Sequence, residues 1–184
     1  MYIFSNHYHE VIQSDFLLVQ PSIGLYSFPN INKIVISLGS DIQSEDKILS
    51  SLCFLDLLGC QKPFLTRIRI SSKSKFLNKG SVIGGKSTLR RSSIYSFLHK
   101  ILFGFLPKVR QFEGLPLLKH PKTFSFIVQD LFIFEDLSFL FSFFEDLGPL
   151  FIDFTFYSKN IEQTFFLIRS FQFCIRESNS VGRV

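Results

Sequence analysis

The sequence predicts an α+β fold of two layers, in which helices cover one face of a β-sheet. Segments with a helical spacing of apolar residues are interspersed among strand-like runs, and no internal repeat is present. A stretch rich in Ser, Lys and Gly predicts a long basic loop. The length of 184 residues suits a single domain, which we expect over residues 1–176, followed by a polar tail over residues 177–184.

The helices are predicted from apolar residues that recur at intervals of three and four. They are expected over residues 8–19, 46–58, 94–105 and 161–171. Ser92 and Ser93 are suitable N-caps for the third helix and Asn160 for the last, because these side chains accept hydrogen bonds from free N–H groups of a first turn.

The strands are predicted from β-branched and aromatic runs over residues 33–38, 64–70, 124–134 and 150–157. In the second run Leu65, Arg67 and Arg69 alternate with the other residues, which predicts that both arginines lie on one face of the strand. Residues 71–85 then have little apolar periodicity, so they are expected to form an exposed loop.

Charge is distributed very unevenly along the chain. Residues 1–56 contain two basic and six acidic side chains, residues 57–112 contain twelve basic and none acidic, and residues 113–184 contain six and nine. Ordinary protein surfaces mix both signs, so the middle segment indicates a polyanionic partner. Nucleic acid is favoured over anionic lipid, because these charges alternate with Gly, Ser and turn residues and form no basic stripe on an amphipathic helix.

A membrane-spanning protein is not expected despite the 25 Phe residues. A spanning helix needs about 20 consecutive apolar residues, and the richest stretch, residues 131–151, is interrupted by four carboxylates. The N-terminus lacks the features of a signal or transit peptide, so we expect the protein to be made where it works.

No metal site, cofactor or catalytic centre is predicted. Cys53, Cys60 and Cys174 are widely spaced and are expected to be reduced thiols. No nucleophile, base and orienting carboxylate can be assembled from the sequence, so we expect no enzymatic activity.

One motif favours a different function. Gly80, Gly85, Lys86 and Ser87 match the G-x-x-x-x-G-K-S spacing of a phosphate-binding loop, and Asp153 ends a possible metal-supporting strand. Such a loop must directly follow an apolar strand, whereas residues 71–79 are basic and polar. A small nucleotide-binding protein therefore stays the alternative hypothesis, and turns in an RNA-facing loop are the preferred explanation of these glycines.

The same segment resembles the ribosomal protein family numbered five, the 5S rRNA-binding family of the large subunit. The blocks that carry the resemblance are residues 59–63, which look like a Gly-Gln-Lys-Pro turn with an inserted Cys, and residues 66–71, 80–90, 95–98 and 106–115. They occur in the family's order and spacing, and the resemblance extends to residues 7–11, 29–39, 124–137 and 152–173. The phosphate-loop match falls inside these blocks.

The resemblance implies an antiparallel sheet that binds 5S rRNA with one face, in the central protuberance of the large subunit. A long basic hairpin loop would reach peptidyl-site tRNA, and large-subunit rRNA, neighbouring ribosomal proteins and a small-subunit protein across an intersubunit bridge would be further partners. Carried over by position, the rRNA-binding residues are Ser37, Leu38, Gln61, Lys62, Arg67, Arg69, Lys86, Thr88 and Arg90. The tRNA-facing loop is Lys73, Ser74, Lys75, Asn78 and Lys79.

The chain also departs from the family pattern at several positions. Ser37 replaces an Asn, Val82 replaces a Pro, and Arg91 replaces the Gly that follows the Thr-Leu-Arg strand. Residues 116–123 replace a longer Gly-rich loop, and the Phe-rich residues 138–144 have no clear counterpart. The Phe bias and the absence of a transit peptide lead us to expect a mitochondrial ribosome rather than a plastid one.

Overall fold

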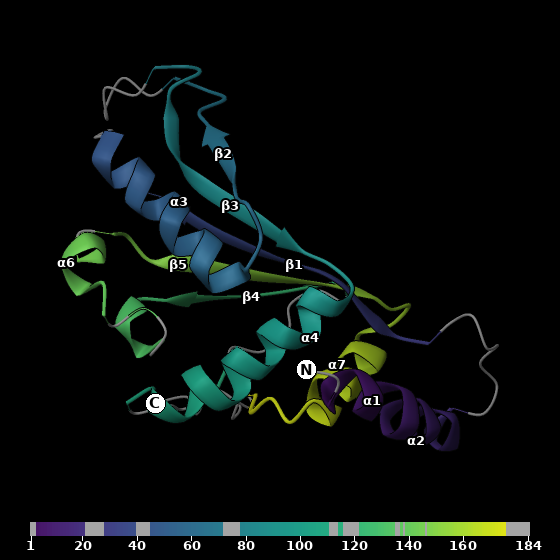
Figure 1. Ribbon diagram of the computed structural model, residues 1–184. Coiled ribbons are helices and arrows are strands. Elements are labelled where there is room, and N and C mark those ends of the chain that lie inside the picture. The colour runs from purple at the N-terminus through teal and green to yellow at the C-terminus, as the bar shows by residue number, and fades with distance from the viewer. Residues whose placement is uncertain are drawn as a thin grey trace, which may run out of the picture. The chain divides into compact units, whose positions relative to one another are not determined.

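The computed structural model describes residues 3–20, 28–39, 45–71, 78–110, 114–115, 122–134, 137, 139–145 and 147–175. Five strands form one antiparallel sheet in the order β2-β3-β1-β5-β4, and helices pack against it (Figure 1). The predicted α+β class is therefore confirmed. The single domain over residues 1–176 stays a prediction, and the predicted tail over residues 177–184 lies outside the described residues.

Contacts divide the chain into two compact units. Unit 1 contains residues 1–33, 90–126 and 153–184, and unit 2 contains residues 34–89 and 127–152. Strands β1 (Asn30–Gly39), β4 (Thr123–Val128) and β5 (Leu150–Tyr157) each have residues in both units.

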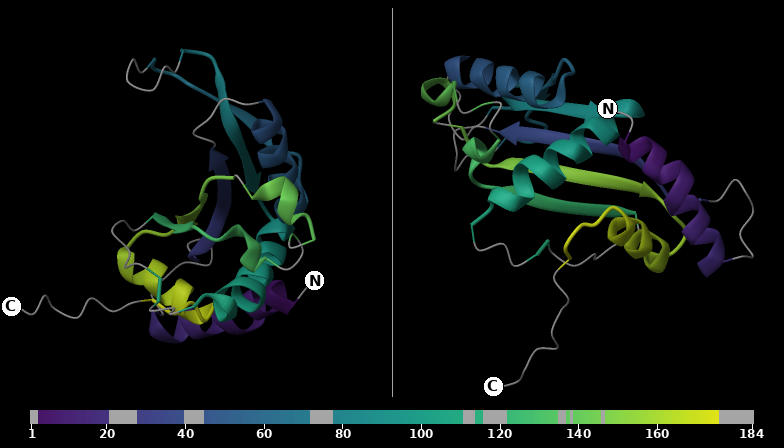
Figure 2. Two further views of the ribbon diagram at one scale, coloured as in Figure 1. Left: turned by 90° about the vertical axis from the view of Figure 1, so that its left-hand side faces the viewer. Right: turned by 60° about the horizontal axis from the view of Figure 1, so that its bottom comes forward.

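Unit 2 is built around helix α3 (Glu45–Gly59). Its first turn contains Glu45 and Asp46, whose negative charges interact favourably with the positive end of the helix dipole. The helix buries Phe54, Leu55 and Leu58, and β1 buries Ile34, Ile36 and Leu38. Figure 2 shows α3 lying along β3 (Val82–Leu89) on one face of the sheet. Short helix α6 (Phe141–Phe144) adds Phe144, whose ring meets that of Phe54 edge-on at 5.3 Å. The predictions for residues 33–38 and 46–58 are confirmed.

The described residues of unit 1 include three helical segments. The N-terminal one comprises α1 (Ile3–His7), a π-helical turn η1 (Tyr8–Ile12) and α2 (Gln13–Val19), so it begins five residues before the predicted start. The second comprises α4 (Ser92–His99), a π-helical η3 (Lys100–Phe105) and a 3₁₀ turn η4 (Leu106–Lys108). The third is α7 (Ile161–Ser170), where the Arg169 guanidinium carbon lies 4.6 Å from the Phe165 ring centre.

Aromatic rings fill the core of unit 1. Phe124 and Phe126 alternate with exposed residues along β4, and the buried Phe154 and Phe156 alternate with half-buried or exposed residues along β5. The rings of Phe126 and Phe154 stack at 6.0 Å, with an angle of 20° between their planes. Stacked and edge-on pairs of this kind add to the free energy gained by burial, so Phe serves here as the main core residue.

Two local predictions are wrong. The strand expected over residues 124–134 ends at Val128, because the Asp130 carboxylate accepts a hydrogen bond from the Phe132 N–H and starts the 3₁₀ turn η5 (Leu131–Ile133). The N-cap of α4 is Arg91, so Ser92 and Ser93 lie within its first turn. Asn160 is the N-cap of α7 as predicted, although its side chain makes no capping hydrogen bond.

No helix in the described ranges is long and apolar enough to cross a membrane. Within the same ranges, no three His, Cys, Asp or Glu side chains gather as they would around a metal ion.

Candidate nucleic-acid interface

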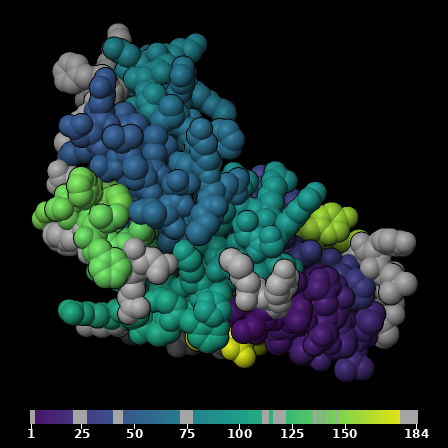
Figure 3. Space-filling model, viewed as in Figure 1, coloured from purple at the N-terminus to yellow at the C-terminus, as the bar shows by residue number. Residues whose placement is uncertain are grey.

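The two faces of the sheet in unit 2 differ because α3 covers only one of them. Gly85 of β3 faces the helix, since a Cβ added there would lie 2.8 Å from Leu52 Cδ2 and 3.0 Å from Leu55 Cδ1. Gly59, the last residue of α3, also packs on β3, since a Cβ added there would lie 3.3 Å from Ser87 Oγ and 3.4 Å from Leu89 Cδ2. Figure 3 shows α3 and α6 side by side on this covered side of the unit. Residues 84, 86 and 88 therefore point to the opposite face, which we call the open face.

A row of three side chains crosses the open face. Lys86 is opposite Ser37 on β1 and opposite Phe64 on β2 (Phe64–Arg67), so the three residues share one face of three neighbouring strands. Lys86 is exposed, Ser37 is half-buried, and Phe64 has 64% of its surface exposed. Thr88 lies beside this row, opposite Val35. An exposed ring beside a lysine and two hydroxyls suits stacking on a base and pairing with a phosphate.

A shift in register occurs where β2 reaches Arg67. Phe64, Leu65 and Thr66 pair in order with Lys86, Gly85 and Gly84, but Arg67 pairs with Val82 instead of Ile83. The extra residue lies on β3, so the regular alternation of side chains along β3 is interrupted at this point. Arg67 is exposed on β2, and the predicted alternation of Leu65, Arg67 and Arg69 stays a prediction.

The strand predicted over residues 64–70 is also shorter than expected, because it ends at Arg67. Backbone hydrogen bonds continue the hairpin for one more residue: Ile68 N donates to Ser81 O and Gly80 N donates to Ile68 O, both at 3.0 Å. Arg69 follows in an exposed bend. It lies near the hairpin end and is not aligned with the row on the open face.

Gly84 brings β3 unusually close to β1. Its neighbours across the sheet are Thr66 on β2 and Gly39 on β1, and a Cβ on Gly84 would collide with the Leu38 carbonyl oxygen. Gly84 is itself buried. Only glycine fits here, because the missing side chain lets the two strands approach closely.

The remaining predicted rRNA residues differ in how accessible they are. Gln61 is half-buried and Lys62 is exposed, both in the turn between α3 and β2, where Cys60 takes a left-handed conformation with φ of 49°. Arg90 is exposed directly after β3 and belongs to unit 1. Leu38 is only 1% exposed and points to the helix-covered side, so its side chain is not available to RNA.

The tip of the hairpin is described only in part. Asn78 and Lys79 are exposed, and the Asn78 carbonyl accepts hydrogen bonds from the backbone N–H and the hydroxyl of Ser81, at 3.3 and 2.7 Å. Lys73, Ser74 and Lys75 lie outside the described residues.

The structure contradicts the phosphate-loop hypothesis. That motif needs a glycine-rich loop that leads into a helix, whose N-terminal N–H groups bind the phosphates. Here Gly85, Lys86 and Ser87 lie inside strand β3, and Gly85 and Ser87 are buried against α3. The expected loop over residues 71–85 also ends early, because the strand starts at Val82.

Sequence reasoning missed two features of this interface. Phe64 was not among the predicted binding residues, but the pairing with Lys86 places it on the open face. The register shift at Thr66 and Arg67 lies beside Gly84 of β3, and a glycine inside a strand is the sequence signal that could have indicated it. The carboxylate-free charge of residues 57–112 was the signal that pointed to this region.

Comparison with known proteins gives consistent matches, although no family model matches the chain. The chain is 32% identical over 135 residues to the large ribosomal subunit protein uL5m of Reclinomonas americana, which covers 71% of this chain and 74% of the relative. It is 34% identical over 113 residues to the large ribosomal subunit protein uL5 of Mycoplasma pneumoniae, covering 60% and 63%. With uL5 of Blochmanniella floridana it shares 26% identity over 157 residues, covering 83% and 82%.

Proposed function

The chain belongs to the uL5 family of large ribosomal subunit proteins, and from this premise we propose that it is a structural constituent of the large ribosomal subunit that binds 5S rRNA with the open face of unit 2. The family is structural and not enzymatic. The observation that carries the proposal is the row of Phe64, Lys86 and Ser37 across three strands, with Arg67 exposed on β2 near this row.

The chemistry of the open face fits an irregular RNA surface. Lys86 and Arg67 neutralise phosphates and release counterions, which supplies affinity without reading sequence. Phe64 offers a ring on which an unstacked base can lie, and Ser37 and Thr88 offer hydroxyls to base edges or ribose 2′-OH groups. Because these groups are fixed on strands, they cost little entropy to order on binding.

The hairpin of residues 68–81 is proposed to contact peptidyl-site tRNA, as the family resemblance implies. Its lysines, among them Lys79, would bind phosphates as flexible point charges, which suits a contact that must accept every tRNA. Other partners are proposed on the same ground: large-subunit rRNA, neighbouring ribosomal proteins and a small-subunit protein.

A mitochondrial ribosome is the proposed location. A mitochondrial-type relative, uL5m, matches over 74% of its length, and bacterial relatives match at similar identity. The Phe-rich composition supports the organelle assignment as an inference about the genome that encodes the chain.

A salt series tests the proposed function. The full chain is titrated with matched 5S rRNA and with a scrambled RNA of equal length and composition. We expect a preference for 5S rRNA that persists as salt rises, because shape and edge contacts add to charge. Equal and steeply salt-dependent binding of both RNAs would contradict a specific 5S site.

A further inference from the structure

Unit 1 contains an open groove of about 540 Å³ that the proposed 5S contact does not use. The N-terminal helix, the start of β1, the start of α4 and the end of β5 supply its walls. Its floor is fixed, because Tyr8, Ile31 and Ile94 are 3–5% exposed. The Tyr8 hydroxyl also donates a 3.0 Å hydrogen bond to the Pro29 carbonyl, which ties the helix to the strand.

The walls combine flat rings with polar groups. Tyr95 is half-buried, with its ring 6.4 Å from that of Tyr8, and Tyr157 is 64% exposed. Asn30 and Asn32 add amides at the start of β1. Burial, reinforced by the neighbouring Tyr8, raises the pKa of Tyr95 to about 12, so its hydroxyl stays neutral and can donate a hydrogen bond.

The charge of the groove favours an anion. Arg91 and His9 line it, and none of the lining residues in the described ranges carries a carboxylate. A planar ring with an attached anion fits such walls, since aromatic side chains stack on bases and Arg pairs with phosphate. The volume falls in the usual range of small-ligand sites, about 300–1,000 Å³.

Arg91 is held in an unusual backbone conformation. Its φ is 55° and its ψ is −126°, a region that glycine adopts freely and that costs other residues on the order of 1–3 kcal/mol. The family resemblance places a Gly here, and a glycine would form the same turn without strain. This chain therefore has a strained arginine that the turn itself does not require. Ile94 N donates to the Arg91 carbonyl at 3.2 Å, which helps to hold the residue at the mouth of the groove.

We propose that this groove binds one unstacked nucleotide of an RNA chain, with the base against Tyr95 and Tyr157 and its phosphate at Arg91. The site would be a second RNA contact, separate from the open face of unit 2. The inference rests on the proposed function in one respect only, that the partner is RNA. The same chemistry would also suit a free nucleotide, so the test compares both.

The experiment uses the full chain with two probes, adenosine 5′-monophosphate and a single-stranded RNA nonamer with a central 5-iodouridine. Arg91→Gly removes the guanidinium and installs the residue that tolerates φ above zero, so the fold is retained. Arg110→Ala is the matched control, because it removes an exposed charge of the same unit that does not line the groove.

We expect Arg91→Gly to weaken binding of the nonamer about five- to tenfold, and Arg110→Ala to weaken it less than about twofold. Ultraviolet crosslinks of the nonamer should map to Tyr95 or Tyr157 in the wild type and be lost in Arg91→Gly. The monophosphate should bind far more weakly than the nonamer.

Three results would overturn the inference: equal nonamer affinity of Arg91→Gly and wild type, crosslinks confined to residues 64–89, or monophosphate binding as tight as that of the nonamer. Binding of matched 5S rRNA is measured on the same samples. If Arg91→Gly has no effect while the 5S preference persists, only the groove assignment fails. If the wild type binds no RNA, the proposed function fails too.

Discussion

Lys86 is the central charged residue of the open face. It is exposed at the centre of β3, and both neighbouring strands place a side chain beside it, Ser37 on one side and Phe64 on the other. The sequence placed Lys86 at the interface only by family resemblance and by the charge of its segment. Its alignment with Phe64 depends on strand pairing, which no local pattern specifies.

Replacing Lys86 with Ala should therefore reduce RNA affinity without unfolding the chain. We expect about a five- to tenfold rise in the Kd for matched 5S rRNA at moderate salt, and a salt slope lower by about one, since one phosphate contact is lost. Filter binding over a salt series measures both quantities.

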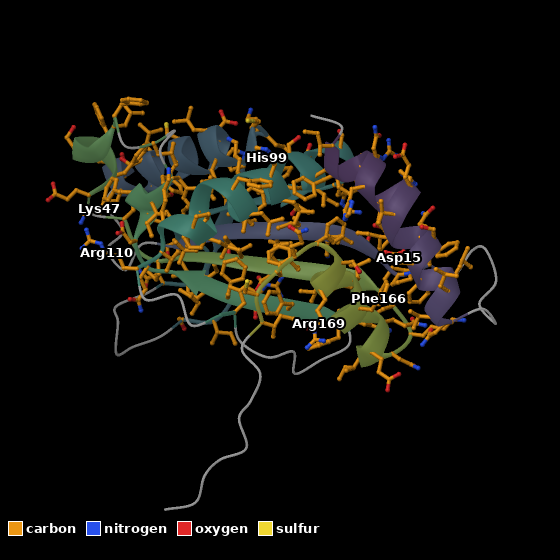
Figure 4. The ribbon with its side chains drawn as sticks, turned by 90° about the horizontal axis from the view of Figure 1, so that it is seen from below. Asp15, Lys47, His99, Arg110, Phe166 and Arg169 are labelled. Carbon is orange, nitrogen blue, oxygen red and sulfur yellow. The ribbon has the colours of Figure 1, made fainter. Side chains whose placement is uncertain are left out.

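Lys47→Ala is the control for this variant, because Lys47 lies on α3, the helix that covers the other face (Figure 4). The control should keep wild-type affinity within about twofold. An equal loss of affinity in both variants would mean that total charge, and not the open face, determines binding.

The stability of the fold should depend on pH in part through one residue, Asp153. It is half-buried in β5, and burial raises the pKa of its carboxyl above its usual value of 3.8. A carboxyl whose pKa is raised by folding favours the native state when it is protonated. Its contribution to stability is therefore fully present below the unfolded pKa and is lost as pH rises through the folded pKa.

The Asp153→Asn variant should be more stable than the wild type at pH 7 and unfold at a higher denaturant concentration. We expect its free energy of unfolding to be higher by less than about 1 kcal/mol, because the carboxylate remains partly in water. The difference should shrink as pH falls toward 3.8. Urea melts of both chains at several pH values measure it, and a variant that is less stable at neutral pH would show that the carboxylate is stabilised by a polar partner.

At the scale of elements, the sequence predicted helices better than strand ends. The apolar spacing of residues 46–58 and 161–171 located α3 and α7 to within about a residue. By contrast, β3 was partly assigned to a loop, because Gly84 and Gly85 remove the alternation that marks a strand. Both glycines are required by close packing, one against β1 and one against α3, and such contacts cannot be read from neighbouring residues.

The close approach at Gly84 can be tested by substitution. Gly84→Ala should lower the free energy of unfolding by at least about 2 kcal/mol, because the new Cβ meets the Leu38 carbonyl and the strands must separate. Gly104→Ala is the matched control, since nothing lies within 4 Å of a Cβ in that helical position.

The control should be unchanged or more stable by about 0.5–1 kcal/mol, because alanine reduces the freedom of the unfolded chain. Chemical denaturation of both variants gives the two values. A tolerated Gly84→Ala would mean that β1 and β3 can move apart at this point, and the fold would then not require glycine there.

For the whole molecule, composition and charge gave the right class of partner, and the arrangement of strands determines where that partner can bind. The carboxylate-free segment of residues 57–112 contains β2 and β3, which supply most of the open face. The groove of unit 1 could not be predicted, because its lining residues come from four separate parts of the sequence. The one sequence feature that pointed to the groove was Arg91, which replaces a Gly of the family pattern.

We propose that the open face of unit 2 anchors the chain in the large ribosomal subunit, and sedimentation can show whether it does. Tagged wild-type chain and an Arg67→Glu, Lys86→Glu double variant are expressed in the native compartment, and ribosomal subunits are separated on a sucrose gradient. We expect the wild type to sediment with the large subunit and the folded double variant to remain near the top of the gradient. If the double variant sedimented with the large subunit at wild-type occupancy, the open face would not be the anchor.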